Sequence, residues 1–293
     1  MAWTNVSAVV LAVLSVAMVS YLIKNGRKKE LWLPLVYFAL MGLLQWITFF
    51  FINQCISPLN RTLTFIAYTH IAFQPLFINM FALNFISEEI KKKITPYVYG
   101  LCWVGAACYY FKAYPFSNTY LCVVGQEAFC GRWACAFKGE WYLAWQWPLN
   151  TWGSASPWID VPPKEYVAGI AARAYMLKGN WEFVWQFLRD FFGTQPLWML
   201  SGHKYILGLH AQAYILSAFC LPLIYGSWRV IGLLFIFGPL LASFSTHHMN
   251  EFVAVWNLYG LGLLLILTVP AFYPYLFVKK WIFNKPIMRL VNH

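Results

Sequence analysis

Apolar stretches close to the length of a membrane-crossing helix recur along this sequence. They cover roughly residues 5–24, 31–53, 62–86, 96–114, 204–226, 230–247 and 251–277. A helix needs about 20 apolar residues to cross a bilayer. Only 11% of the 293 residues are charged, against roughly a quarter in soluble domains. The sequence therefore predicts an all-α integral membrane bundle of about seven transmembrane helices, as one domain over residues 1–293.

The distribution of charge predicts the orientation of this bundle. One set of alternate connections holds twelve of the 21 basic residues and three of the ten acidic ones, a net +9. The other side holds nine basic and seven acidic residues, a net +2. The positive-inside rule then puts the N-terminus outside and the C-terminus in the cytoplasm of a plasma or inner membrane. The first stretch lacks a preceding basic region, so we expect it to remain as a helix.

The overall net charge of +11 is thus a topology signal, with some attraction to anionic lipids. It gives no reason to expect nucleic acid as a partner. The basic residues of the predicted inner side are Lys24, Arg27, Lys28, Lys29, Lys91, Lys92, Lys93, Arg229, Lys279, Lys280, Lys285 and Arg289.

The longest connection, residues 115–203, is predicted to be an extracytoplasmic insertion. Four cysteines lie on that side of the membrane: Cys55, Cys122, Cys130 and Cys135. An even number of cysteines in an oxidising compartment predicts two disulfides, and three connectivities are open. A metal site is the weaker alternative, because the spacing lacks the close cysteine pairs of structural zinc sites.

Within this insertion, residues 165–178 and 181–192 predict two helices that are too short to cross the membrane. The second has an apolar face at helical spacing, which favours amphipathic helices lying in the outer membrane interface. Its residues are Trp181, Trp185, Leu188 and Phe192.

Several polar side chains interrupt the apolar stretches. His70 and Gln74 are one helical turn apart, and Pro75 suggests a kink beside them. Gln45 lies at a depth similar to that of His70, counting inward from Gln54 and Thr62. Polar groups in a bilayer core must face other helices or a wet cavity.

The fifth and sixth apolar stretches add further polar groups near the same outer end. His210 enters from the fifth stretch, and His247 lies one turn before Glu251. We expect Gln45, His70, His210, His247 and Glu251 to converge on one outward-opening pocket. A buried Glu251 carboxylate should be paired with His247, a metal or an arginine. The inner half of the bundle is expected to be a plug.

These residues could carry chemistry of two kinds. His247, Glu251 and His70 are the candidate catalytic residues, with Glu251 as the general base, and the same three are the candidate ligands for zinc or iron. His210, Gln45 and Gln74 are the candidate cofactor-binding residues, and His70 or His210 could ligate haem. The sequence contains none of the spaced metalloprotease or hydrolase motifs.

Several motifs resemble a family of polytopic membrane proteins of unknown function that occurs in bacteria, algae and large DNA viruses. The central one is the span Tyr68-Thr69-His70-Ile71-Ala72-Phe73-Gln74-Pro75. The resemblance covers most of the chain and implies no activity, and residues 152–198 are longer than the family pattern. The other matching motifs are Leu44-Gln45, Gln54-Cys55, Cys130-Gly131, Cys135, Gly139, Asn250-Glu251 and Val255-Trp256.

Three function classes follow. The first is a metal-assisted or acid–base enzyme that acts on a membrane lipid or a small apolar substrate. The second is a cofactor- or pigment-binding protein, or an accessory subunit with protein partners in a membrane complex. The third is a transporter or channel, which the lack of buried carboxylates and of an internal repeat disfavours. A purely structural role, in which the polar side chains only join helices, is the remaining alternative.

Overall fold

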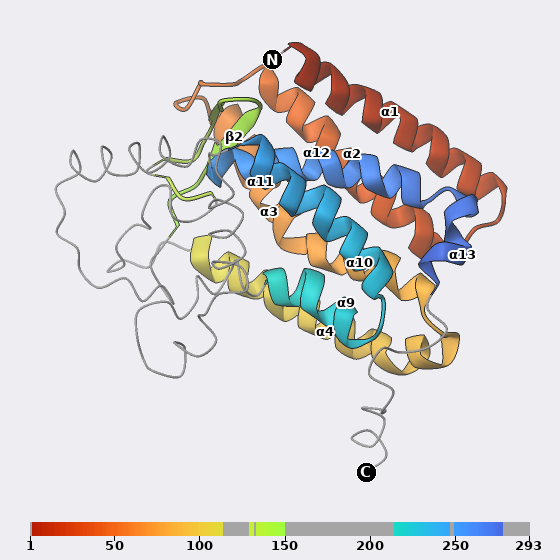
Figure 1. Cartoon of the computed structure of the whole chain (residues 1–293). Coiled ribbons are helices and arrows are strands. Elements are labelled where there is room, and N and C mark those ends of the chain that lie inside the picture. The colour runs from red at the N-terminus through yellow and green to blue at the C-terminus, as the bar shows by residue number, and fades with distance from the viewer. Residues whose placement is uncertain (1, 114–128, 132, 150–213, 247–248, 278–293) are drawn as a thin grey trace.

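The computed structural model describes residues 2–113, 129–131, 133–149, 214–246 and 249–277 (Figure 1), and it is mostly helical. Four described segments are long and apolar enough to cross a membrane: Val6–Lys24, Lys29–Phe49, Pro58–Phe85 and Asn250–Leu267. They belong to α1 (Ala2–Lys24), α2 (Lys29–Phe49), α3 (Pro58–Ala82) with the short 3₁₀ turn η1 (Leu83–Phe85), and α12 (Met249–Leu267).

Local sequence signals set where these helices begin. Gly26 adopts a φ of 62° in the turn between α1 and α2, a left-handed conformation that glycine adopts at little cost. Pro58 is at the start of α3, where its missing N–H would have no helical partner. Glu88 and Glu89 open α4 (Glu88–Ala113), where negative charge favours the helix dipole.

Helices adjacent in the sequence pack side by side from α1 to α4, and α12 packs against both α1 and α2. Of the four segments named above, α3 and α12 are the most buried and α1 is the least. In Figure 1, α12 runs beside α2 and α3, whereas α1 lies at the edge of the bundle. The core is therefore built around α3 and α12.

A second group of helical pieces completes the described bundle. They are η2 (Leu216–Cys220), α9 (Leu221–Ile224), α10 (Trp228–Phe235), η3 (Ile236–Leu240), α11 (Leu241–Ser245), η4 (Pro270–Phe272) and α13 (Tyr273–Leu276). The run 228–245 is helical throughout, with the wider π-type turn η3 around Pro239. Such turns accommodate the hydrogen bond that proline removes.

A two-stranded antiparallel hairpin lies at one end of the helices (Figure 1). It pairs β1 (Cys135–Lys138) with β2 (Leu143–Gln146), in a register that places Cys135 opposite Gln146 and Lys138 opposite Leu143. The prediction of an all-α chain missed this hairpin. Its strands are buried on consecutive residues, so they lack the alternation of apolar and polar residues that reveals a half-buried strand.

One of the expected disulfides joins Cys55, in the α2–α3 connection, to Cys135 at the start of β1. Cys130 is also disulfide-bonded, whereas Cys122 lies outside the described residues. The same holds for the predicted interfacial helices at 165–178 and 181–192, with Trp181, Trp185, Leu188 and Phe192. The limits of the insertion at 115–203 remain a prediction.

Candidate functional site

The buried carboxylate of Glu251, in the first turn of α12, binds the turn of the hairpin. Its Oε2 accepts hydrogen bonds from the backbone N–H of Glu140 at 2.9 Å and from the Thr246 hydroxyl at 2.8 Å. Its Oε1 accepts from the N–H of Trp141 at 2.7 Å and from the N–H of Tyr142. All four partners are donors, which matches the acceptor-only chemistry of an ionised carboxylate.

Glu251 was expected to pair with His247, a metal or an arginine, and His247 lies outside the described residues. Its described partners are three backbone amides and one hydroxyl. A carboxylate has about four lone-pair sites, and these four donors use them. Glu251 in this geometry therefore holds the hairpin in place, and the geometry gives no support to its assignment as a base or a metal ligand.

Gln45 belongs to the same hydrogen-bonded assembly. Its Nε2 donates to the carbonyl oxygen of Ala254 on α12 at 3.0 Å, and its Oε1 accepts from the Tyr142 hydroxyl at 3.1 Å. Tyr142 thus binds Glu251 through its backbone and Gln45 through its side chain. Two of the five residues predicted to share a site are brought together in this way.

Further side-chain amides dock the hairpin on the helices. Asn60 donates to the carbonyl oxygen of Ala136 and accepts from its N–H, both at 2.8 Å. Asn250 donates to the carbonyl of Cys130 at 3.0 Å. At Gly139, a Cβ atom would lie 2.6 Å from the carboxyl carbon of Glu251. Several residues of the motifs that resemble the family therefore lie in one interface, where the hairpin packs on the helices.

His70 lies in a different environment from Gln45. Its ring stacks on Tyr37 of α2 with centroids 3.7 Å apart, and Tyr37 also stacks on Phe77 at 3.7 Å. The Tyr37 hydroxyl donates to the His70 carbonyl oxygen. The buried Nε2 of His70 has no hydrogen-bond partner among the residues that the structure describes.

The expected common depth of Gln45 and His70 is not what these contacts indicate. The residue on α2 that lies beside His70 is Tyr37, two turns before Gln45. The expected depth was counted from Gln54 and Thr62, whereas α2 ends at Phe49 and α3 begins at Pro58. The observed boundaries place Gln45 nearer the end of α2, and His70 farther from the start of α3, than the prediction assumed.

Gln74 joins three segments in the interior. Its Nε2 donates to the Oδ1 of Asn257 on α12, and its Oε1 accepts from the Tyr214 hydroxyl at 2.7 Å. One turn further along α3, Asn79 donates to the Ser217 carbonyl and accepts from the Tyr225 hydroxyl. Because these amides bond to neighbouring helices, their described role is interhelical.

The shared pocket of five residues stays a prediction. His210 and His247 lie outside the described residues, so their positions relative to His70 and Glu251 are not tested. Within the described part of the chain, no group of three or more His, Cys, Asp or Glu side chains gathers as a metal site would require. The metal, haem and catalytic assignments of His70, His210 and His247 are likewise untested.

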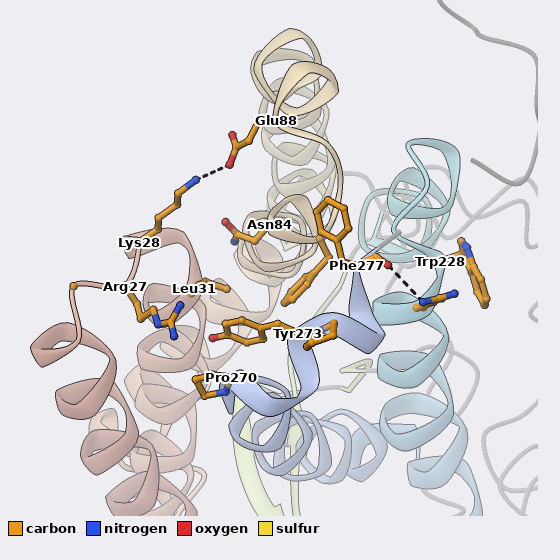
Figure 2. Close-up of a pocket in the computed structure, with 13 residues that line it drawn as sticks. Arg27, Lys28, Leu31, Asn84, Glu88, Trp228, Pro270, Tyr273 and Phe277 are labelled. Carbon is orange, nitrogen blue, oxygen red and sulfur yellow. Dashed lines mark hydrogen bonds and ion pairs between the residues drawn. The ribbon is translucent and has the colours of Figure 1, made fainter. Parts of the chain in front are cut away.

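A cavity lies at the opposite end of the helices from the hairpin. It has a volume of about 1220 Å³ and is lined by residues of four segments, 26–31, 84–88, 228–229 and 270–277. We call it the basic pocket, because Arg27, Lys28 and Arg229 line it with Glu88 as the one acidic side chain of its lining. Figure 2 shows Arg27 and Lys28 on one side of this pocket and Trp228 on the other.

An exposed ion pair closes one edge of the basic pocket. Lys28 Nζ lies 2.5 Å from Glu88 Oε1, and Figure 2 shows the two side chains reaching toward one another. Their hydrogen bond raises the pKa of Lys28 above its ordinary value and lowers the pKa of Glu88 below its own. Both groups are therefore charged at neutral pH, and the lining carries three positive charges against one negative charge.

The two arginines of the basic pocket are held against aromatic rings. The Arg27 guanidinium lies 5.8 Å from the ring centre of Tyr273, and that of Arg229 lies 5.3 Å from the ring of Trp228. Arg229 also donates through Nη1 to the carbonyl oxygens of Tyr275 and Phe277, at 2.9 and 3.5 Å. Cation–π contacts and backbone hydrogen bonds fix these cations without neutralising them.

Arg27, Lys28 and Arg229 contributed only to the predicted topology, and this pocket was not predicted from the sequence. A signal was present, because Trp228-Arg229 and the aromatic run Tyr273-Pro274-Tyr275 place cations and aromatic rings at the ends of apolar stretches. The cavity forms only when segments separated by up to about 250 residues meet, and no local pattern reports that.

Comparison with known proteins identifies the family. A search of curated proteins and a search of solved structures find no match. A family of unknown function, DUF5765, matches residues 6–177 and 159–276, which together reach from one end of the described bundle to the other. The two matched segments overlap at residues 159–177, within the stretch 152–198 that the resemblance set apart. The chain therefore belongs to DUF5765, a family of unknown function.

Proposed function

We propose that this protein is a multi-pass integral membrane protein that binds an anionic, phosphate-bearing ligand in the basic pocket. The observation that carries the proposal is a cavity of about 1220 Å³ lined by Arg27, Lys28 and Arg229 at the ends of membrane-length helices. Guanidinium groups bind phosphate oxygens through pairs of charge-assisted hydrogen bonds.

Both arginines have donors left for such a ligand. Among the described residues, Arg229 makes its two backbone contacts through Nη1, which leaves its Nε and Nη2 hydrogens for an anion. The Arg27 side chain contacts the Tyr273 ring and makes no hydrogen bond or ion pair with the described residues. The pocket thus presents positive charge that its own lining does not neutralise.

The proposal includes the complete membrane topology. We propose that the predicted stretches 96–114, 204–226 and 230–247 cross the membrane with the four helices described above, which gives seven spans. These stretches overlap α4 and the helical segments 214–224 and 228–245. The N-terminus is then outside, the C-terminus is cytoplasmic, and the basic pocket opens at the cytoplasmic surface. The negative surface potential of that leaflet attracts basic residues, so the pocket would lie beside the anionic lipid headgroups themselves.

This proposal takes membrane lipids as the natural partners. The enzyme class with His247 and Glu251 as catalytic residues stays a prediction, and the four donors around Glu251 weigh against it. Gln74 and Asn79 bond to neighbouring helices in the interior, which favours a structural use of these side chains over cofactor binding or transport.

Thermal unfolding of the detergent-purified protein tests the proposal. Glycerophosphoglycerol, a soluble anionic headgroup, should raise the midpoint temperature, because a ligand that binds only the folded state stabilises it by about 2.7 kcal/mol at a hundred times its dissociation constant. Glycerophosphocholine, which has no net charge, should have a much smaller effect.

Two variants distinguish binding in the basic pocket from a general effect of the protein's positive charge. Arg27→Gln should raise the ligand concentration needed for a given stabilisation by about ten- to a hundredfold, since a hydrogen bond to a charged group contributes about 1.5–3 kcal/mol. Lys92→Gln removes the same charge from an exposed residue of α4 that does not line the pocket, and it should respond as the unmodified protein does. Equal responses of all three proteins would contradict the proposal.

A further inference from the structure

An apolar groove adjoins the basic pocket. It has a volume of about 540 Å³ and lies between α1 and the end of α12, with Leu14, Ala17, Met18 and Tyr21 on one side. Its other side is formed by four residues of the segment 265–270, ending in Pro270, which also lines the basic pocket. The cationic cavity and the apolar groove are therefore parts of one continuous surface.

The groove follows the part of the bundle that faces outward. Its four α1 residues are spaced by three and four positions, so they lie on one face of the helix. The side chain of Leu14 is 49% exposed and that of Ile266 is 51% exposed. From Leu14 to Tyr21 the groove extends about 10 Å along the helix axis, away from the end that holds the cations.

We infer that the ligand of the basic pocket is an anionic membrane phospholipid, with its phosphate headgroup at Arg27 and Arg229 and one acyl chain in the groove between α1 and α12. This inference rests on the proposed function. A soluble phosphate compound would use only the cationic cavity. A phospholipid uses both parts, because its charged and apolar ends are joined in the same order as the pocket and the groove.

Tyr273 lies where the two parts meet. Its ring contacts the Arg27 guanidinium, and its hydroxyl donates to the Thr268 carbonyl oxygen at 2.9 Å. Figure 2 shows Tyr273 beside Pro270 and below Leu31 at the floor of the pocket. Tyrosine is favoured at the level of lipid headgroups, where its ring is in an apolar environment and its hydroxyl in a polar one. This position is the expected boundary between headgroup and acyl chain.

Photo-crosslinking in nanodiscs tests the inference. The probe is phosphatidylglycerol with a diazirine in one acyl chain, diluted in phosphatidylcholine, and the labelled peptides are identified by mass spectrometry. Labelling should concentrate on residues 14–21 and 265–270. The same diazirine carried by phosphatidylcholine should label these peptides several-fold less.

Matched variants on α1 distinguish the groove from the rest of the helix surface. Ala17→Trp fills the groove and should lower the labelling several-fold, whereas Val13→Trp, at an exposed position outside the groove, should leave it unchanged. Soluble glycerophosphoglycerol should stabilise the Ala17→Trp protein as it does the unmodified one, because the cationic cavity is intact.

The outcomes separate the inference from the proposed function. If Ala17→Trp leaves the labelling unchanged while Arg27→Gln still weakens headgroup binding, the pocket binds an anion but the acyl chain does not occupy the groove, and the inference is wrong. If phosphatidylglycerol binds no more tightly than its soluble headgroup, the ligand is a soluble phosphate compound. If Arg27→Gln has no effect on either measurement, the proposed function is itself wrong.

Discussion

At the scale of single residues, Glu251 shows how a buried carboxylate at the end of an apolar stretch obtains hydrogen-bond donors from a distant part of the chain. The sequence predicts that a buried carboxylate needs compensation, and this expectation is met. The compensating groups are backbone amides of residues 140–142, which are 109 to 111 positions away. A sequence shows which side chains are charged, but it does not show which backbone donors will be presented to them.

A neutral replacement of Glu251 tests its structural role. Glu251→Gln places amide hydrogens against the N–H groups of the hairpin turn, so we expect a loss of about 2 kcal/mol of stability and a midpoint of thermal unfolding lower by several degrees. Glu140→Gln changes an exposed carboxylate of the same turn and should have little effect. Equal midpoints for the two variants would show that the carboxylate does not hold the hairpin.

At the scale of elements, the hairpin and its disulfide were only partly predictable. The even number of cysteines on the predicted oxidising side indicated that Cys55 and Cys135 form disulfides, and the structure joins these two. The pairing itself could not be predicted, because it depends on Asn60 and Asn250 docking the segments around Ala136 and Cys130. Those contacts link residues that are 76 and 120 positions apart.

Removal of this disulfide should loosen the hairpin. The bond closes a chain segment of 80 residues, and the entropy of such a loop corresponds to a stabilisation of up to about 4 kcal/mol. The double variant Cys55→Ser/Cys135→Ser should therefore unfold at a lower temperature, and protease should cleave between residues 129 and 149 more rapidly. Cys108→Ser, at a free cysteine of α4, should behave as the unmodified protein. Unchanged cleavage would mean that the amide contacts alone hold the hairpin.

The helices were more accessible to prediction than the hairpin. The expected stretches 5–24, 31–53 and 62–86 overlap α1, α2 and α3 closely, because hydrophobic length is a local property of the sequence. The sequence predicted interior positions for Gln45 and Gln74, because a bilayer core would offer them no water, and both residues are buried. Their partners did not follow. The assumed helix ends at Gln54 and Thr62 differ by five and four residues from the observed ends at Phe49 and Pro58, which was enough to misplace His70 relative to Gln45.

At the scale of the whole molecule, the two ends of the bundle differ in chemistry. The end with the hairpin is held by carboxamides, the Glu251 carboxylate and a disulfide. The opposite end contains the basic pocket. The sequence directed attention to the first end, because its histidines and glutamines are conspicuous in apolar surroundings. It predicted a plug at the second end, where the structure has a cavity of about 1220 Å³.

Native mass spectrometry of the protein released from detergent micelles tests the central claim most directly. After equilibration with equal amounts of phosphatidylglycerol and phosphatidylcholine, the unmodified protein and Lys92→Gln should retain phosphatidylglycerol in preference. Arg27→Gln should lose that preference, because the basic pocket no longer presents its free guanidinium. If the unmodified protein retains the two lipids equally, or if Arg27→Gln retains phosphatidylglycerol as well as Lys92→Gln does, the basic pocket is not a site for anionic lipid.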